Sequence, residues 1–455
     1  MTKSYLDGTR GRARAFGRSA LVVASTVILG ACSIDDMLEV EDVDVTTPDA
    51  LLDPANLSSV RALGIGDFSV AFGGAGTAEG VVGFSGVMAD EFQHIGSWQW
   101  IREADTRILA EDNSGVTDVF RALHRARSST EIATQAYEAL APETPEHAEQ
   151  VNLHGYTYVF FAENFCSGVP FSGADAGTYT YGVPLPTDSV YNRAIAAFDE
   201  ALALAQAAGS EDQENLARVG KARVLMDLDR YAEAAALVDG VPTDWVYESE
   251  YSENTGRQNN GVFAVTLNRR EYGLSHLEGG NGAPFRPATP DPRLPYNVGE
   301  RAFDTTLRAY EQNKYPARSS AIVLASGTEA ALIRAEEALD RGASDTYLPI
   351  LNDLRAEEGM DPLTDPGTAA ARVDQFFDER ALWLFGTGNR LSDLRRLVRQ
   401  YGLTESEAFP SGAYVRERMD GTLSPSGTYG TDMNWPVPFD ERNNPNFAGC
   451  LSRGA

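Results

Sequence analysis

The stretch DEFQHIGSWQW, residues 90–100, gathers side chains that could hold a sugar or a peptide. Its aromatic, imidazole and neighbouring guanidinium groups belong to Phe92, His94, Trp98, Trp100 and Arg102. Aromatic planes pack against the C–H faces of a sugar ring, while amides, carboxylates and guanidinium groups bond its hydroxyls. If the segment is extended, the two tryptophans lie on one face. The pattern predicts a ligand site; the alternative is that both tryptophans pack under the loop as core.

A second group with similar chemistry lies in the long irregular stretch near residues 242–316. Its members are Tyr272, His276, Asn281, Phe285 and Arg286. Turn-forming residues are frequent there, and an irregular segment of this length is usually functional. We expect the group to contribute to a ligand face. The alternative is that these side chains only pack the loop against its helical scaffold.

A series of charged residues between positions 379 and 395 could suggest catalysis. The series consists of Glu379, Arg380, Arg390, Asp393 and Arg395. A glycosidase needs two carboxylates at a defined separation beside a sugar site, and the sequence does not supply that distance. We interpret the series as structural, because such groups on neighbouring helices form charge-assisted pairs that fix packing.

Motifs of the common enzyme classes are missing from the 455 residues. There is no HExxH, GxSxG or phosphate loop, GAGTAEG has the wrong glycine interval for a dinucleotide fingerprint, and the five histidines lack metal spacing. We therefore expect a binding protein with no catalytic residue, cofactor or metal. The net charge of −28 makes nucleic acid and anionic lipid surfaces poor partners.

Helices are the elements that must position these groups. From residue 145 onward, apolar residues recur at spacings of three and four, as in VYNRAIAAFDEALALAQ. The segment LARVGKARVLMDLDRYAEAAALV alternates bulky and small residues across a tight turn, as a tetratricopeptide unit does. Further helix pairs are predicted over residues 328–360 and 373–402. The sequence thus predicts a mainly α fold, interrupted by irregular regions near residues 242–316 and 409–455.

The first residues have the order of a secretory signal, with basic residues before an apolar run. The run from Ala20 to Ala31 is shorter than the roughly twenty residues that a membrane span needs. LGAC at residues 29–32 matches the lipobox of bacterial lipoproteins, so we expect residues 1–31 to be removed and Cys32 to carry the acyl chains that anchor the protein. The alternative is a plain signal peptide with an incidental cysteine.

Removal of the signal would leave a net charge of about −32 and two further cysteines, Cys166 and Cys450. An even pair in an oxidising compartment suggests a disulfide. Two separately buried thiols are the alternative. We expect an acidic tether over residues 32–56, followed by a single domain over residues 57–455.

Four stretches in chain order resemble the SusD/RagB family of outer-membrane nutrient-uptake lipoproteins. They are LHGYTYVFFAENFCSGVPF, ALIRAEEAL, DERALWLFGTGNRLSDLRR and NWPVPFDERNNPNF. The resemblance implies a scaffold of about four tetratricopeptide-like helix pairs, with the irregular remainder packed on one side as the ligand face. Two departures from the family pattern are Cys166, where an aspartate or similar residue is common, and Cys450, at the aromatic end of the tail. Their joint occurrence favours a bond between the two motifs.

The resemblance also implies a role. Such a protein is lipid-anchored at the outer membrane, exposed at the surface, and binds an oligosaccharide or a peptide that it delivers to a SusC-like TonB-dependent transporter. Its only membrane attachment would be the lipid. A tetratricopeptide-type adaptor lipoprotein, holding protein partners in the cell envelope, is the alternative.

Overall fold

The computed structural model describes residues 53–175, 178–287, 289–299 and 301–455. The predicted signal, Cys32 and the tether up to residue 52 lie outside the described residues. The described part belongs to one compact unit that spans Pro48–Ala455. The predicted mainly α, tetratricopeptide-like fold is confirmed. Among the helices of these ranges, none combines the length and the hydropathy that a membrane span requires.

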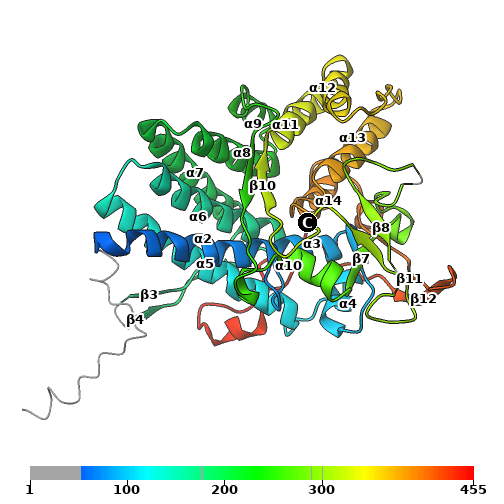
Figure 1. Ribbon diagram of the computed structural model, residues 1–455, viewed down its shortest axis with the longest axis horizontal. Coiled ribbons are helices and arrows are strands. Elements are labelled where there is room, and N and C mark those ends of the chain that lie inside the picture. Colours follow the sequence, from blue (N-terminus) through cyan, green and yellow to red (C-terminus); the bar gives the residue numbers. More distant parts are fainter. Residues whose placement is uncertain (1–52, 176–177, 288, 300) are drawn as a thin grey trace, which may run out of the picture. The chain divides into compact units, whose positions relative to one another are not determined.

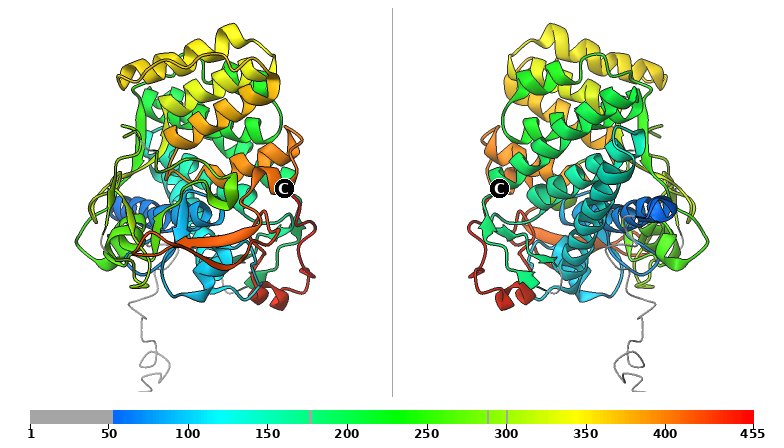
Figure 2. Two further views of the ribbon diagram at one scale, coloured as in Figure 1. Left: turned by 90° about the vertical axis from the view of Figure 1, so that its right-hand side faces the viewer. Right: turned by 90° about the vertical axis from the view of Figure 1, so that its left-hand side faces the viewer.

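Stacked helices form the scaffold. They are α2 (Leu57–Gly73), α5 (Ser114–Leu140), α6 (Pro145–Asn164), α7 (Thr187–Ala208), α8 (Glu211–Asp227), α9 (Tyr231–Leu237), α11 (Gly327–Asp340), α12 (Ser344–Glu357), α13 (Ala369–Trp383) and α14 (Arg390–Arg399). Helix α2 packs on α5, each helix from α5 to α8 packs on the next, α9 packs on α11, and α11 packs on α12 and α13. Figures 1 and 2 show this stack from three sides.

Local sequence signals set several helix boundaries. Thr144 caps α6 by accepting a hydrogen bond from the backbone N–H of His147 at 3.3 Å, and Pro145 follows as the first helical residue. Ser326 caps α11 in the same way through the N–H of Glu329 at 3.1 Å. Helix α7 ends at Gly209, whose φ of 65° is left-handed.

Phe198 of α7 shows how closely the helices approach one another. A Cβ atom at Gly220 of α8 would lie 2.5 Å from the Phe198 ring, and one at Gly155 of α6 would lie 3.0 Å from it. The ring also meets Tyr156 edge to face, with centroids 5.1 Å apart. Because glycine has no side chain at these two positions, the Phe198 ring fits between α6 and α8.

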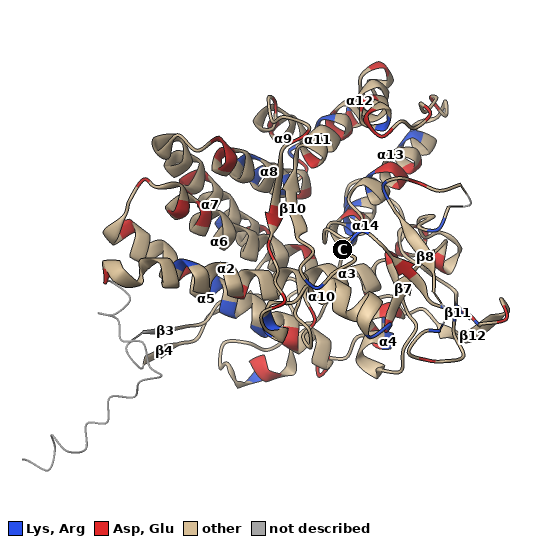
Figure 3. Cartoon of the chain, in the orientation of Figure 1, with Lys and Arg blue, Asp and Glu red and all other residues tan. Residues whose placement is uncertain are grey.

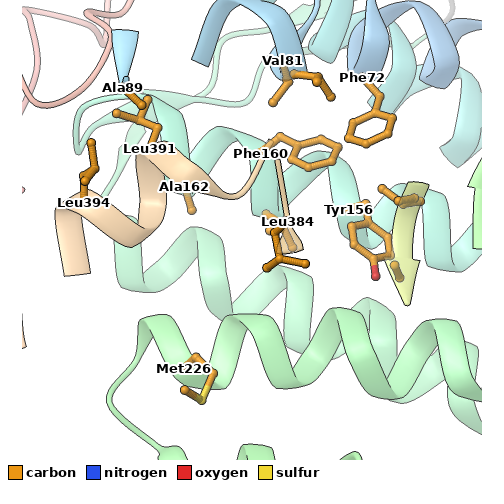
Figure 4. Packing of buried hydrophobic residues seen from close by; sticks show 14 of the residues in the cluster. Phe72, Val81, Ala89, Tyr156, Phe160, Ala162, Met226, Leu384, Leu391 and Leu394 are labelled. Carbon is orange, nitrogen blue, oxygen red and sulfur yellow. The ribbon is translucent and has the colours of Figure 1, made fainter. Parts of the chain in front are cut away.

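The main core continues from this stack toward the first helices. The rings of Phe72 and Phe160 lie parallel, with centroids 5.3 Å apart, and Val81 lies close to them (Figure 4). Leu391 and Leu394 of α14 extend the same core. The irregular segments therefore pack against the surface of the helical stack.

Short strands pair two by two across the irregular segments, all antiparallel. The pairs are β1 (Phe92–His94) with β7 (Tyr272–Leu274), β2 (Val169–Pro170) with β5 (Pro184–Leu185), β3 (Gly173–Asp175) with β4 (Thr178–Thr180), β6 (Val246–Ser249) with β10 (Ile322–Ser326), β8 (Tyr296–Val298) with β9 (Tyr310–Gln312), and β11 (Ala413–Glu417) with β12 (Leu423–Thr428). In the first pair His94 faces Tyr272 and Phe92 faces Leu274.

Short helices complete these segments. They are η2 (Pro54–Asn56), α3 (Val81–Met88), α4 (Gln99–Asp105), η3 (Gly256–Gln258), α10 (Gly261–Phe263), η4 (Ala264–Asn268), η5 (Glu278–Gly280), α15 (Glu405–Ala408) and η6 (Phe439–Asn443). Figure 1 shows α4, β7, β8, β11 and β12 gathered on one side of the stack α6–α9. We call this side the irregular face.

Candidate functional site

Two buried carboxylates hold the segment that carries the predicted tryptophans. Asp90 accepts hydrogen bonds from Arg390 of α14 at 2.6 and 2.8 Å, and from the backbone N–H of Ala283 at 2.6 Å. Glu91 accepts one from the N–H of Gly386 at 2.8 Å, and burial raises the pKa of Glu91 to about 8. Both acids position β1 against the scaffold.

Trp98 and Trp100 form one stacked pair at the start of α4. Trp98 is the N-cap of that helix, so the segment is not extended, yet the ring centroids lie 4.5 Å apart with the planes inclined by 27°. The Arg269 guanidinium carbon lies 4.9 Å from the centre of the Trp98 ring. Both rings rest on the core and remain partly exposed. They form an aromatic platform flanked by a cation, and Arg102 is exposed on the same helix.

Phe92 and His94 do not belong to this platform, which corrects the sequence prediction. Phe92 has no exposed surface, and its ring packs edge to face on Phe385 with centroids 5.2 Å apart. His94 is also buried, and burial lowers its pKa. The side chains of strand β1 alternate between its faces, and these two point into the core. They anchor the strand and cannot contact a ligand.

Arg286 is the centre of a second partly exposed group. Its guanidinium carbon lies 3.8 Å from the centre of the Tyr310 ring, and its Nη1 donates to Glu417 at 3.3 Å. The Tyr310 hydroxyl donates to the other Glu417 oxygen at 2.8 Å. His276 accepts the backbone N–H of Arg286 at 3.2 Å. A pocket of about 220 Å³ opens here, with His276, Arg286, Glu417 and Gln93 among its lining residues.

The other members of the second predicted group have structural roles. Tyr272 and Phe285 have no exposed surface, and the Tyr272 hydroxyl donates to buried Glu79 at 2.9 Å. The Asn281 amide donates to the carbonyls of Phe409 and Glu407 at 2.7 and 3.0 Å. Tyr272 and Phe285, which the sequence analysis expected at a ligand face, thus have no exposed surface in this structure, because β7 and the loop after it pack into the core.

A pair of buried acids lies beneath the irregular face. Asp105 accepts hydrogen bonds from the Tyr414 hydroxyl at 2.6 Å and the His94 N–H at 2.7 Å, and Glu278 accepts from the Tyr429 hydroxyl at 2.6 Å. Burial, followed by the nearby Glu278 carboxylate, raises the pKa of Asp105 well above its ordinary value. These bonds connect α4, η5 and the β11–β12 hairpin.

The charged series on α13 and α14 makes buried ion pairs and hydrogen bonds. Arg380 and Arg396 both bond Asp393 at 2.9 Å; although burial opposes ionisation, these arginines lower the Asp393 pKa. Glu379 bonds Arg293 and Arg355, each at 2.7 Å. Arg390 bonds Asp90, and Arg395 donates to the backbone carbonyl of Ala162 at 3.1 Å. Figure 3 shows both signs of charge close together on these helices.

A disulfide joins Cys166, just after α6, to Cys450 in the C-terminal segment, with Cα atoms 5.9 Å apart. Backbone hydrogen bonds continue the connection. The N–H of Cys166 donates to the Trp435 carbonyl at 2.8 Å, and the N–H of Leu451 donates to the Ser167 carbonyl at 2.7 Å. The bond therefore ties the end of α6 to the tail.

Sequence reasoning missed Arg269, Tyr310 and Glu417. Each comes from a different segment, and no spacing in the chain relates one to another. Only the aromatic content of the irregular region pointed to Tyr310. Within the described ranges, no group of three or more His, Cys, Asp or Glu side chains could hold a metal ion.

Stacked helices with an irregular face that presents aromatic and guanidinium groups define a tetratricopeptide-like scaffold of the SusD type. No family model matches the sequence, and neither does any curated protein. Solved structures match throughout most of its length. A SusD-like carbohydrate-binding protein from Bacteroides fragilis shares 14% identity at a TM-score of 0.63, covering 87% of this chain and 99% of that chain.

Two further neighbours agree. Surface glycan-binding protein A from Bacteroides uniformis shares 13% identity at a TM-score of 0.60, with 88% of this chain and 99% of that chain covered. A SusD/RagB family protein from Bacteroides thetaiotaomicron shares 14% identity at a TM-score of 0.57, with 85% and 94% covered. The protein has the SusD/RagB fold, as the sequence resemblance predicted.

Proposed function

We propose that this protein is a lipid-anchored, surface-exposed lipoprotein that binds glycans and delivers them to a SusC-like TonB-dependent transporter of the outer membrane. It binds its ligand without cleaving it. The observation that carries the proposal is the stacked Trp98–Trp100 platform beside Arg269, on the irregular face of a SusD-type fold. The carbohydrate-binding and glycan-binding names of two structural neighbours support the ligand class.

The platform has the chemistry that sugar binding needs. The two rings cover one face of each other, so C–H groups of a sugar would pack on the ring surface that stays exposed, while the guanidinium over Trp98 supplies hydrogen-bond donors. The Arg286–Glu417 group adds donors and acceptors around a pocket on the same face. A peptide ligand would pack on the same ring surfaces, so the binding test uses both oligosaccharides and peptides.

The first test is loss of binding in Trp98→Ala and Trp100→Ala. Removal of a central aromatic anchor should cost about 2 kcal/mol, or roughly thirtyfold in affinity. Calorimetric titration of the full chain in detergent against oligosaccharides and peptides would measure the loss. Trp245→Ala is the matched control, because this partly buried tryptophan bonds Asp212 beside the helical stack. Unchanged ligand affinity in both platform variants would refute the site.

The anchor and the partner have separate tests. We propose that Cys32 is acylated and that residues 32–56 act as a tether to the domain. Cys32→Ser should then release the protein from outer-membrane fractions, while its ligand affinity stays the same. Purification of the acylated protein in mild detergent should co-isolate a TonB-dependent transporter. If other envelope proteins co-purify and the transporter does not, an adaptor role is favoured.

A further inference from the structure

A cavity of about 430 Å³ lies away from the tryptophan platform, between α5, the β2–β4 segment and η6. Its volume falls within the range of roughly 300–1,000 Å³ that is typical of ligand pockets. The residues that line it belong to α5, to residues 170–173 and 179, and to the stretch 438–441. None of the predicted site residues lines this cavity.

Arginines of α5 line the cavity in a chain with an acidic excess. Arg121 and Arg125 are four residues apart, so their Cβ atoms lie on one helix face, about 6 Å from each other. Arg121 pairs with Asp440 of η6. Arg127, also in the lining, pairs with Glu131 at 3.1 Å. Figure 3 shows the basic segments along α5.

Arg125 is the uncommitted cation of this set. It is exposed and lines the cavity, and it forms neither an ion pair nor a hydrogen bond with the part of the chain that the structure describes. The remaining lining acid, Glu441, has its pKa raised by burial. Arg121 is paired with Asp440 whereas Arg125 has no such partner, so the Arg125 guanidinium can bond one further anion.

His124 supplies a second unpartnered group. Its Nε2 atom is buried and has no hydrogen-bond partner among the described residues. Burial, followed by the charge of Arg127, lowers the His124 pKa to about 3, so the ring is neutral at physiological pH and can donate or accept one hydrogen bond. The ring packs against Phe120 and Phe161, with centroids 4.5 Å from each, so His124 forms part of the wall of the cavity and makes no contact with a ligand.

The rest of the lining combines apolar residues with the hydroxyl groups of Thr117, Ser128 and Ser172. Phe120, Pro170 and Pro438 form walls without charge, and the Tyr179 ring at the rim is 74% exposed. The apolar face of a ligand ring would therefore pack against these residues, and a carboxylate on that ring would lie near Arg125 and Arg121. The cavity combines one apolar side with one cationic side.

We propose that this cavity is a second ligand site, which binds a ring-bearing carboxylate of monosaccharide size. Arg125, beside the paired Arg121, holds the carboxylate, and Tyr179 covers the apolar face of the ring. The proposal does not depend on the tryptophan platform, because the two sites share no side chain. A uronic acid and an aromatic acid both carry the required chemistry.

Titration of the full chain in detergent with D-galacturonate, D-galactose and benzoate, followed by ligand-observed NMR, tests the proposal. We expect an acid to bind at least tenfold more tightly than neutral galactose. Preference for galacturonate identifies a sugar acid, and preference for benzoate identifies an aromatic acid. If neither acid binds more tightly than galactose, the proposal is wrong.

Variants locate the binding. Arg125→Ala should reduce the affinity for the acid at least tenfold, and Arg125→Lys should retain part of that affinity. Arg230→Ala is the control: Arg230 is exposed, pairs with Glu233 at the start of α9, and its removal should leave the affinity unchanged. Trp98→Ala should leave acid binding intact. Loss of acid binding in Trp98→Ala, or unchanged binding in Arg125→Ala, would place the acid elsewhere and overturn the assignment.

Discussion

Arginines of the scaffold and arginines of the irregular face use the same guanidinium group in different ways. Arg380 and Arg396 have side chains only 4% and 2% exposed, and both bond Asp393, Arg380 from α13 and Arg396 from within α14. Arg269 and Arg286 are 18% and 17% exposed and lie over the rings of aromatic residues. Arg396 also lies over a ring, that of Phe377, and Arg269 and Arg286 also face carboxylates. Exposure, rather than the type of partner, therefore separates the scaffold arginines from those of the irregular face.

Asp393→Asn should produce the largest effect on the scaffold side of this comparison. The change leaves two buried guanidinium groups without their shared carboxylate, and breaking a buried pair costs roughly 3–5 kcal/mol in the free energy of unfolding. Urea unfolding would measure it. Asp199→Asn is the control, because its pair with Lys221 is exposed and should contribute at most about 1 kcal/mol. Equal losses in the two variants would contradict the structural assignment.

Loss of the disulfide should have the next largest effect. The bond closes a loop with a sequence separation of 284 residues, and removal of a native disulfide typically costs about 2–5 kcal/mol. The double variant Cys166→Ser/Cys450→Ser would be compared with the reduced native protein by the same unfolding measurement. Agreement between the two would assign the loss to the bond; an unchanged free energy would show that backbone contacts alone hold the tail.

Asp105→Asn tests the irregular face and should have the smallest effect. The raised Asp105 pKa means that the folded state keeps a proton which the unfolded state releases. Its contribution is complete below the unfolded pKa, near 4, and declines as the pH rises toward the folded pKa. An asparagine cannot release a proton, so the variant should lose less stability as the pH rises above about 4. Parallel pH profiles for variant and native protein would contradict this.

The scaffold could be predicted because its signals are local. Apolar spacing, the glycine after α7 and the motif GNRLSDLRR depend on neighbours within a few turns of one helix. The structural interpretation of Glu379, Arg380 and Asp393 followed from the same argument, and these groups form buried pairs.

The face could be predicted only in part, because its residues come together from distant segments. Trp98 and Trp100 are separated by one residue in the sequence and stack as a pair, although at the start of a helix rather than on a strand. Phe92 and Tyr272 have the same residue types as a sugar site but point inward, since one position in a strand decides between core and surface. The contact of Arg286 with Tyr310 had no signal in the chain.

The tail that Cys450 fastens to α6 also supplies one wall of the α5 cavity, through Pro438 and Asp440. Asp440 meets Arg121 across a separation of 319 residues. Binding of a compound in this cavity would therefore depend on the contact between α5 and the C-terminal segment. Comparing the affinity of this compound for the oxidised and the reduced protein would show how far the disulfide, rather than the backbone hydrogen bonds beside it, holds this wall in place.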